Sequence, residues 1–277
     1  MIEPRAGDAY PPHSGSIIAP GQRIMTVTAC LLVIGNEILS GRTQDANIRF
    51  LAMGLGEIGI ALDEVRVIPD RRDRIVNTIV DCRARFDHVF TTGGIGPTHD
   101  DITAACVAEA VGLPLEIHEE SFRLLQDAIG RDKFNAARQR MAMLPRGAAP
   151  IPNAVSVAPG FSIANIHVLA GIPRVMQAMF RALAPTLKGG APLVSAAWHA
   201  VGLREGTLAD GFAALQDAFP DLDLGSYPFE RPDGQRGASL VAKGYDAQRV
   251  AAAADRIRDL IATLGHVPIS GEPADTI

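Results

Sequence analysis

The sequence predicts an α/β protein with a three-layer domain around a mostly parallel sheet, followed by a small α+β domain. Apolar runs typical of buried strands alternate with helical stripes as far as Leu187, which favours a sheet covered by helices on both faces. After Gly189, Gly190 and Pro192 the order changes to β-α-β-β-α, with room for a short last strand. This is the order of a ferredoxin-like sandwich.

The first domain opens on a strand at Thr26 to Ile34, a continuous apolar run of the kind found in central parallel strands. A helix follows that carries Ile48, Leu51 and Leu55 on one face, with Asp45 as its N-cap. The strand, the polar glycine-containing loop and the capped helix together form a layout often used to bind a ligand.

A short alternating strand at Val65 and Val67 comes next. We expect Asp70 to cap the following helix, whose apolar stripe includes Ile75 and Ile79. Asp70 could also act in a site, but capping is a sufficient explanation for it.

The residues from Val89 to Thr103, V-F-T-T-G-G-I-G-P-T-H-D-D-I-T, join a buried strand to the next helix. Gly93, Gly94 and Gly96 allow a tight turn and a close approach to a ligand, and Pro97 stiffens the exit of the loop. Free N–H groups and the positive end of the helix would face one point, which predicts an anion site.

Two carboxylates, Asp100 and Asp101, lie where this helix is expected to begin. In a pure phosphate site they would repel the ligand, so three interpretations remain. They hold a divalent metal, they accept hydrogen bonds from N–H and O–H groups of a heterocycle or ribose, or one of them caps the helix. Asp101 is the better candidate for the cap.

The run from Thr92 to Asp101, T-G-G-I-G-P-T-H-D-D, closely resembles the G-G-(L/I)-G-P-T-x-D-D signature of the molybdopterin-binding (MoCF) domain in CinA-like competence/damage-inducible proteins. The same domain type occurs in molybdenum cofactor synthesis proteins and at the front of eukaryotic FAD synthases. A match of this length is far more specific than a lone G-x-G-x-x-G.

Two further segments resemble the same family. Gly35 to Asn47 is similar to its G-(D/N)-E-(I/L)-L-x-G-x-x-x-D-(T/A)-N motif, and Asn153 to Phe161 to its N-x-x-G-x-A-P-G-F motif, with Ser156 where the family usually has Gly. Leu169 to Met176 follows the pattern L-P-G-V-P-x-E-M, but Val175 replaces the Glu. If that carboxylate helps metal binding or hydrolysis in relatives, Val175 argues against hydrolysis here.

The resemblance implies a ligand site shared by these loops, with Asp100 and Asp101 as catalytic and metal-binding candidates. The ligand-binding candidates it implies are Gly35, Asn36, Glu37, Ser40, Gly41, Asp45, Thr92, Gly93, Gly94, Ile95, Gly96, Pro97, Thr98, Pro159, Gly160, Gly171 and Pro173.

We expect three regions: a disordered tail at residues 1–24, the molybdopterin-binding-like domain at 25–188 and the small α+β domain at 192–277. The deamidase domain that ends full-length CinA proteins would have no room in these 277 residues. A basic cluster, which is either a solvated face or an arm for ligand phosphates, consists of Arg131, Lys133, Arg138, Arg140 and Arg146.

Composition excludes several other classes. The net charge of −5 gives no general attraction to nucleic acid or to acidic membranes. The three cysteines lie far apart and predict reduced core residues of a cytoplasmic protein, not a disulfide framework or a zinc site. No apolar run has the length of a membrane span.

Two functions remain open. In the first, the protein binds a phosphorylated pterin (molybdopterin) or a related nucleotide and breaks no bond. In the second, which the resemblance implies, it is a metal-dependent pyrophosphatase acting on ADP-ribose or a similar nucleotide, with Mg²⁺, Mn²⁺ or Co²⁺ at the Asp pair. The family also implies a homo-oligomer, either a dimer or a trimer.

Overall fold

The computed structural model describes residues 26–274, which divide into two compact units that meet at Leu193 and Val194. The tail expected at residues 1–24 lies outside the described residues. The first unit contains β1 (Val27–Ile34), α1 (Asn36–Leu39), α2 (Asn47–Glu57), β2 (Ile60–Ile68), α3 (Arg72–Arg85), β3 (His88–Thr92), α4 (Thr103–Val111), β4 (Leu115–Ile117), α5 (Glu119–Ile129), α6 (Ala136–Gln139), β5 (Met143–Pro145), β6 (Ala149–Ile151), β7 (Gly160–Ile163), β8 (Ile166–Leu169) and α7 (Pro173–Leu183).

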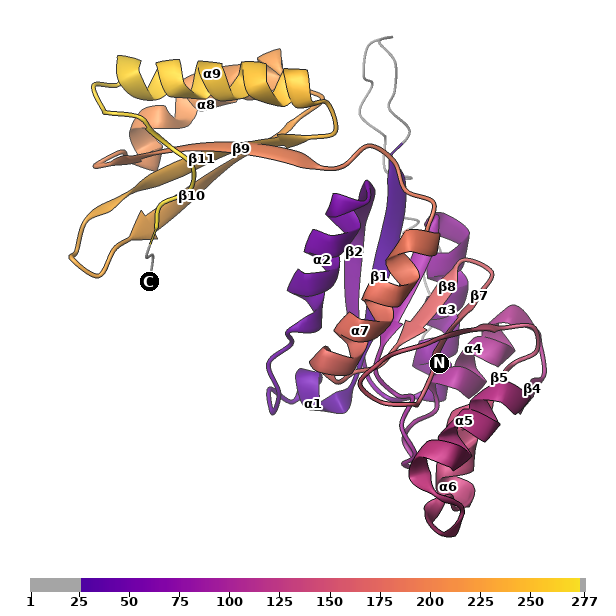
Figure 1. Cartoon of the computed structure of the whole chain (residues 1–277). Helices are drawn as coiled ribbons and strands as arrows, with labels where there is room; N and C mark the ends of the chain where they lie inside the picture. The colour runs from indigo at the N-terminus through magenta and orange to yellow at the C-terminus, as the bar shows by residue number, and fades with distance from the viewer. Residues whose placement is uncertain (1–25, 275–277) are drawn as a thin grey trace, which may run out of the picture. The chain divides into compact units, whose positions relative to one another are not determined.

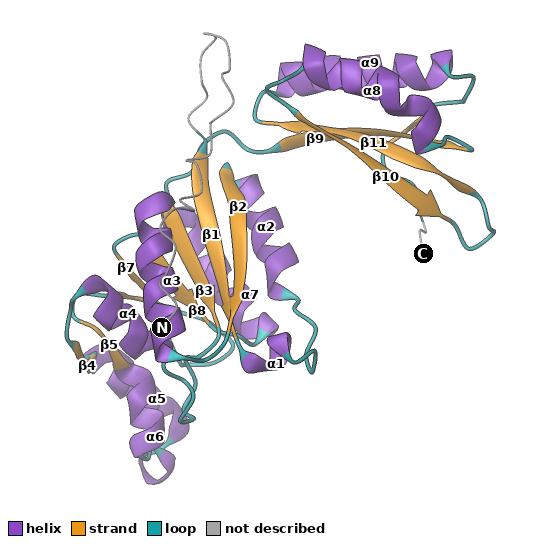
Figure 2. Cartoon of the chain, turned by 180° about the vertical axis from the view of Figure 1, so that it is seen from behind, coloured by secondary structure: helices purple, strands orange, loops and turns teal. Residues whose placement is uncertain are grey.

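The first unit is built on a six-stranded sheet in the order β2-β1-β3-β8-β7-β6. The first four strands in this order run parallel, whereas β7 and β6 are antiparallel to their neighbours. Figures 1 and 2 show this sheet from opposite sides, with α2 and α7 over one face and α3 and α4 over the other. The predicted three-layer, mostly parallel sheet is confirmed.

Strand β1 shows how the sequence produces this layering. Its side chains alternate between the two faces, as in any strand. Leu31 and Val33 pack in the core under α2 and α7, while Leu32 and Ile34 pack in the core under α3 and α4. Because both faces of β1 are buried, its sequence is one unbroken apolar run.

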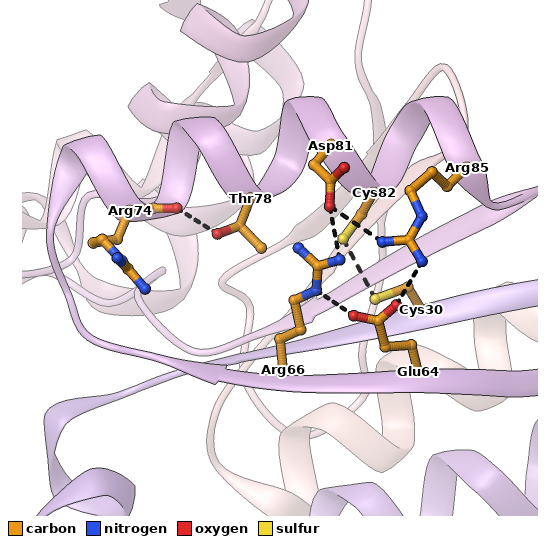
Figure 3. A network of polar contacts seen from close by, with 8 residues as sticks. All are labelled: Cys30, Glu64, Arg66, Arg74, Thr78, Asp81, Cys82 and Arg85. Carbon is orange, nitrogen blue, oxygen red and sulfur yellow. Dashed lines mark hydrogen bonds and ion pairs between the residues drawn. The ribbon is translucent and has the colours of Figure 1, made fainter. Parts of the chain in front are cut away.

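A ring of four alternating charges covers the join between β2 and α3 (Figure 3). Arg66 contacts Glu64 and also Asp81, the latter at 2.7 Å, while Arg85 reaches Glu64 at 3.1 Å and Asp81 at 3.3 Å. Hydrogen bonds from Arg66 lower the pKa of both carboxyl groups. The ring therefore stays ionised at neutral pH and holds the outer strand to the helix.

Beneath this ring lie two of the three buried free thiols, Cys30 and Cys82, whose sulfur atoms are 3.5 Å apart (Figure 3). Their hydrogen bond raises the pKa of Cys30 and lowers that of Cys82, so Cys30 is the donor. The third thiol, Cys106, has its pKa raised to about 11 by burial.

The second unit contains β9 (Val194–Val201), α8 (Glu205–Ala218), β10 (Asp223–Glu230), β11 (Arg236–Gly244), α9 (Ala247–Thr263) and β12 (Ile269–Ser270). Its sheet has the order β10-β11-β9-β12, with every pair antiparallel. Both helices lie on one face of this sheet (Figure 2). This arrangement confirms the predicted ferredoxin-like domain.

A chain of polar contacts with the buried His167 at its centre crosses the first unit. Ser162 bonds His167 at 2.9 Å, His167 bonds His88 at 3.0 Å, and His88 reaches the carbonyl of Lys188 at 3.3 Å. His167 is only 6% exposed, and the ring of Phe90 stacks on it at 4.9 Å between centroids. Burial, and to a smaller extent the neighbouring His88, lower the pKa of His167 from 6.5 to about 4.

This lowered pKa predicts acid sensitivity. The unfolded chain binds the His167 proton below about pH 6.5, whereas the folded chain resists it until about pH 4, so stability falls as the pH drops through this interval. The loss should reach about 2 kcal/mol between pH 7 and pH 5. Urea unfolding of the parent and of His167→Gln at both pH values would show a smaller fall in the variant, and an equal fall would contradict the prediction.

Candidate functional site

A cleft of about 770 Å³ lies at the carboxyl ends of the parallel strands β1, β3 and β8. Ile34 ends β1, Gly93 follows β3 and Ala170 follows β8, and all three line the cleft. Ligands of α/β sheets generally bind in such a crevice beyond the carboxyl ends of the strands. The order of strands therefore places loops that are distant in the sequence around one cavity.

The glycine loop, which we define as Gly93 to Pro97, forms one wall of the cleft. Gly93 has φ 102° and Gly94 has φ 67°, conformations that favour glycine. A Cβ atom on Gly93 would lie 2.1 Å from the carbonyl oxygen of Ile34, and one on Gly94 would lie 2.2 Å from Oγ1 of Thr103. Both positions need glycine, so Gly94→Val would distort the loop itself.

Thr103, the fully buried first residue of α4, fixes the loop from behind. Its N–H donates to the carbonyl of Gly94, and its hydroxyl donates to the carbonyl of Gly93, both at 3.0 Å. Within residues 26–274, the N–H groups of Gly94, Ile95 and Gly96 donate to no protein acceptor. These three donors belong to cleft-lining residues and are free for a ligand.

The Asp pair closes the exit of the loop, and the expectation that it starts the helix is wrong. Helix α4 begins at Thr103, two residues beyond Asp101, and no side chain caps it. Asp101 instead accepts the N–H of Thr98 at 2.7 Å, and the Thr98 hydroxyl lies against both carboxylates, 2.6 Å from Asp100. This hydrogen bond lowers the pKa of Asp100.

A second acidic pair comes from the other side of the cleft. Glu37 and Asp70 both line it, although capping of α3 was the role favoured for Asp70 over a place in the site. That expectation is wrong, because α3 begins at Arg72 and Asp70 accepts the N–H of Asn36 at 2.8 Å. Sequence reasoning missed Asp70 because an Asp before a helix is also the commonest capping pattern.

Helix α5 and the turns after it add an apolar wall, made by Leu125, Ala128, Ile129 and Met141. Leu125 is buried in a small core of its own with Phe134 and Ala142. The cleft therefore combines the backbone of the glycine loop and four carboxylates with an apolar wall.

The basic side chains that follow α5 mostly bond to residues away from the cleft. Arg146 pairs with Glu116 at 2.9 Å, and Arg138 donates to the carbonyl of Lys133 at 2.7 Å. Arg140 differs, because it donates to the carbonyl of Pro97 in the glycine loop at 2.9 Å. Within residues 26–274, this is the one hydrogen bond from a side chain of the cluster to a residue that lines the cleft.

The other predicted residues divide into two groups. Gly171 and Pro173 line the cleft, as does Val175, which is 7% exposed and packs in the core under α7. Asp45 accepts the N–H of Ile48 at 2.8 Å and so caps α2 as expected. The predicted residues that do not line the cleft are Gly35, Asn36, Ser40, Gly41, Asp45, Thr92, Thr98, Pro159 and Gly160.

The fit for a resident metal ion is poor. Between residues 26 and 274, no group of three or more His, Cys, Asp or Glu side chains is arranged to hold one. The same stretch contains no helix long and apolar enough to cross a membrane.

Comparison with known protein families identifies the family to which the cleft-bearing domain belongs. The family model of the probable molybdopterin binding domain matches residues 30–189, which include the whole cleft. The chain belongs to this family. The middle domain of FAD synthase matches residues 199–268, within the second unit.

Individual relatives agree with the predicted CinA-like kinship, which is confirmed. A protein of Pyrobaculum arsenaticum is 34% identical over 210 residues, which cover 72% of this chain and 79% of that protein. A CinA-like protein of Desulfovibrio desulfuricans is 31% identical over 242 residues, covering 83% of this chain but 55% of that protein. The crystal structure of CinA from Thermoplasma acidophilum, a protein of unknown function, covers 57% of this chain and 96% of its own with a TM-score of 0.55 and 31% identity.

In this molybdopterin-binding domain, the buried Thr103 hydroxyl should carry much of the loop's stability. Thr103→Val keeps the shape but leaves the Gly93 carbonyl unpaired, at a cost of about 1–3 kcal/mol in the free energy of unfolding. Thr78→Val is the matched control, because the exposed Thr78 hydroxyl bonds only the Arg74 carbonyl within its own helix. Urea unfolding of both variants would test this, and equal effects would contradict it.

Proposed function

We propose that the first unit binds a phosphorylated pterin, molybdopterin or a close relative, or a related nucleotide, with its phosphate on the glycine loop. The observation that carries the proposal is that three consecutive cleft-lining residues, Gly94, Ile95 and Gly96, have backbone N–H groups with no acceptor among residues 26–274. Backbone N–H groups beside a helix N-terminus bind phosphate well. The loop would not need to rearrange when a phosphate binds, because the two hydrogen bonds from Thr103 already fix it.

The carboxylates suit the heterocycle of such a ligand. A pterin ring presents neighbouring N–H donors along one edge, and ionised carboxylates accept such pairs. Glu37 and Asp70 lie on the side of the cleft formed by the β1 and β2 loops and are the acceptors we assign to this edge. The apolar wall around Leu125, Ile129 and Met141 supplies a surface for the flat ring.

Phosphate beside four carboxylates needs a compensating positive charge. Arg140 is the cation already bonded to the glycine loop, through the neutral carbonyl of Pro97. A phosphate oxygen is a stronger acceptor for a guanidinium than a carbonyl oxygen is. We therefore assign Arg140 to the ligand phosphate in the bound state.

The gathering of Glu37, Asp70, Asp100 and Asp101 also supports a second candidate, a metal-dependent nucleotide pyrophosphatase. Since the described side chains form no complete metal site, Asp100 and Asp101 would have to share a divalent ion with the phosphates of the substrate. Val175 counts against this candidate, because an apolar side chain occupies the position of the family's Glu. Binding without hydrolysis is the function we favour.

The binding proposal predicts that Arg140→Gln weakens phosphorylated ligands selectively. Calorimetric titration should show a loss of about 1 kcal/mol for AMP, the cost of one exposed charge-assisted hydrogen bond, and little change for adenosine. Arg138→Gln is the matched control, since Arg138 bonds a carbonyl away from the cleft. An unchanged AMP affinity in Arg140→Gln would remove Arg140 from the phosphate site.

The identity of the ligand can be tested on the same preparation. Native mass spectrometry of the purified protein should show a co-purifying pterin or nucleotide, and titration with molybdopterin, AMP and ADP-ribose should rank the candidates. Failure of all three to bind would contradict the proposed function.

The two candidate functions predict different results in a hydrolysis assay on the parent and on Asp100→Asn. Asp100 is exposed and holds only the Thr98 side chain, so Asp100→Asn should leave the fold intact. In a pyrophosphatase this change should remove most ADP-ribose hydrolysis with Mg²⁺, Mn²⁺ or Co²⁺, while Asp132→Asn, on the exposed turn after α5, should not. In a binding protein the parent shows no turnover with any of these metals. Turnover that survives Asp100→Asn would exclude Asp100 from the chemistry.

A further inference from the structure

Asn47, the first residue of α2, links this helix to the cleft without lining it. Its side chain is 4% exposed, and its Nδ2 donates to the carbonyl of Gly171 at 2.8 Å. Within the described residues its Oδ1 atom is buried without a hydrogen-bond partner. The amide therefore makes one bond across 124 residues of sequence and leaves its acceptor unused.

The Gly171 turn on which Asn47 acts presses against the glycine loop. A Cβ atom on Gly171 would lie 3.2 Å from the Cα of Gly93, and the N–H of Gly93 donates to the carbonyl of Leu169 at 3.2 Å. Both Gly171 and Gly93 line the cleft. A displacement of the Gly171 turn would thus be passed directly to the start of the glycine loop.

We propose that Asn47 is a positioning residue that holds the Gly171 turn against Gly93 and so sets the geometry of the phosphate-binding loop. Its part in ligand binding rests on the proposed function, whereas its part in ordering the two turns does not. A space-filling role would not need an amide, since an apolar side chain of similar volume would avoid the cost of the unpaired Oδ1. The role of the Asn47 side chain therefore depends on its Nδ2 donor.

Hydrogen–deuterium exchange on the full-length protein tests the ordering. In Asn47→Ala, exchange of the hydrogen-bonded amides beside the two turns should rise about tenfold, the usual effect of losing one buried hydrogen bond. These amides are those of Gly93 and Thr98 at the glycine loop and of Val175 and Met176 after the Gly171 turn. Asn47→Asp keeps the volume but presents an acceptor to the Gly171 carbonyl at neutral pH, so it should raise exchange at the same residues. If the Ala variant does not fold, the Asp variant carries the test.

Asp45→Ala is the matched control, because Asp45 caps the same helix without reaching the cleft. It should raise exchange within residues 46–57 only. The proposal is overturned if the Asn47 variants also raise exchange only in residues 46–57, or if neither of them folds.

Affinity gives a second readout, with AMP as the probe. Both Asn47 variants should weaken AMP binding about tenfold, and Arg49→Gln, at an exposed position of the same helix, should not. Equal losses in all three variants would trace the effect to α2 and overturn the proposal. If the parent does not bind AMP, the proposed function fails at this probe, while the exchange measurement still decides the role of Asn47.

Discussion

The close packing of Gly93 between two neighbouring turns is the constraint on which the cleft depends. On one side the carbonyl of Ile34 leaves no room for a Cβ atom, and on the other side the Gly171 turn lies against its Cα. Ile34 ends β1, and Gly93 and Gly171 come just after β3 and β8, which are the next two strands in the sheet. The sheet therefore brings three backbones together at one edge, and only glycine allows them to approach so closely.

This packing explains why the donors of the cleft are backbone atoms. With Gly93 fixed, the Thr103 bonds hold the loop against α4, and the N–H groups that follow have no acceptor within residues 26–274. The surrounding side chains are acidic and would disfavour an anion alone. A ligand that carries both a phosphate and a donor-rich ring satisfies the two halves together, which a simple phosphate ion would not.

Periodicity and local motifs were sufficient to predict the layers of the first unit and the ferredoxin-like second unit, because burial on both faces leaves a clear mark on strands such as β1. They failed where one residue type serves two roles. Asp70 and Asp101 both precede helices, yet Asp70 holds the Asn36 turn and Asp101 holds Thr98. Those partners depend on how loops meet in space, which no spacing rule contains. The contribution of Leu125 to the cleft was likewise not predicted, because the apolar residues along one face of α5 have the same spacing as those of any helix packed on a core.

In the two candidate functions, phosphate would be bound by backbone groups, whereas hydrolysis would depend on side chains. The phosphate binding that we propose for Gly94, Ile95 and Gly96 would use backbone N–H groups, which every residue except proline possesses, so it would persist as long as the loop keeps its conformation. Hydrolysis depends on particular carboxylates, and substitution of a single one can remove it. Val175 stands where the family pattern that Leu169 to Met176 resembles has Glu. It packs in the apolar core under α7, and the loop and the Thr103 bonds are in place. A domain of this design could therefore bind its ligand without hydrolysing it, which is the function that we propose for this cleft.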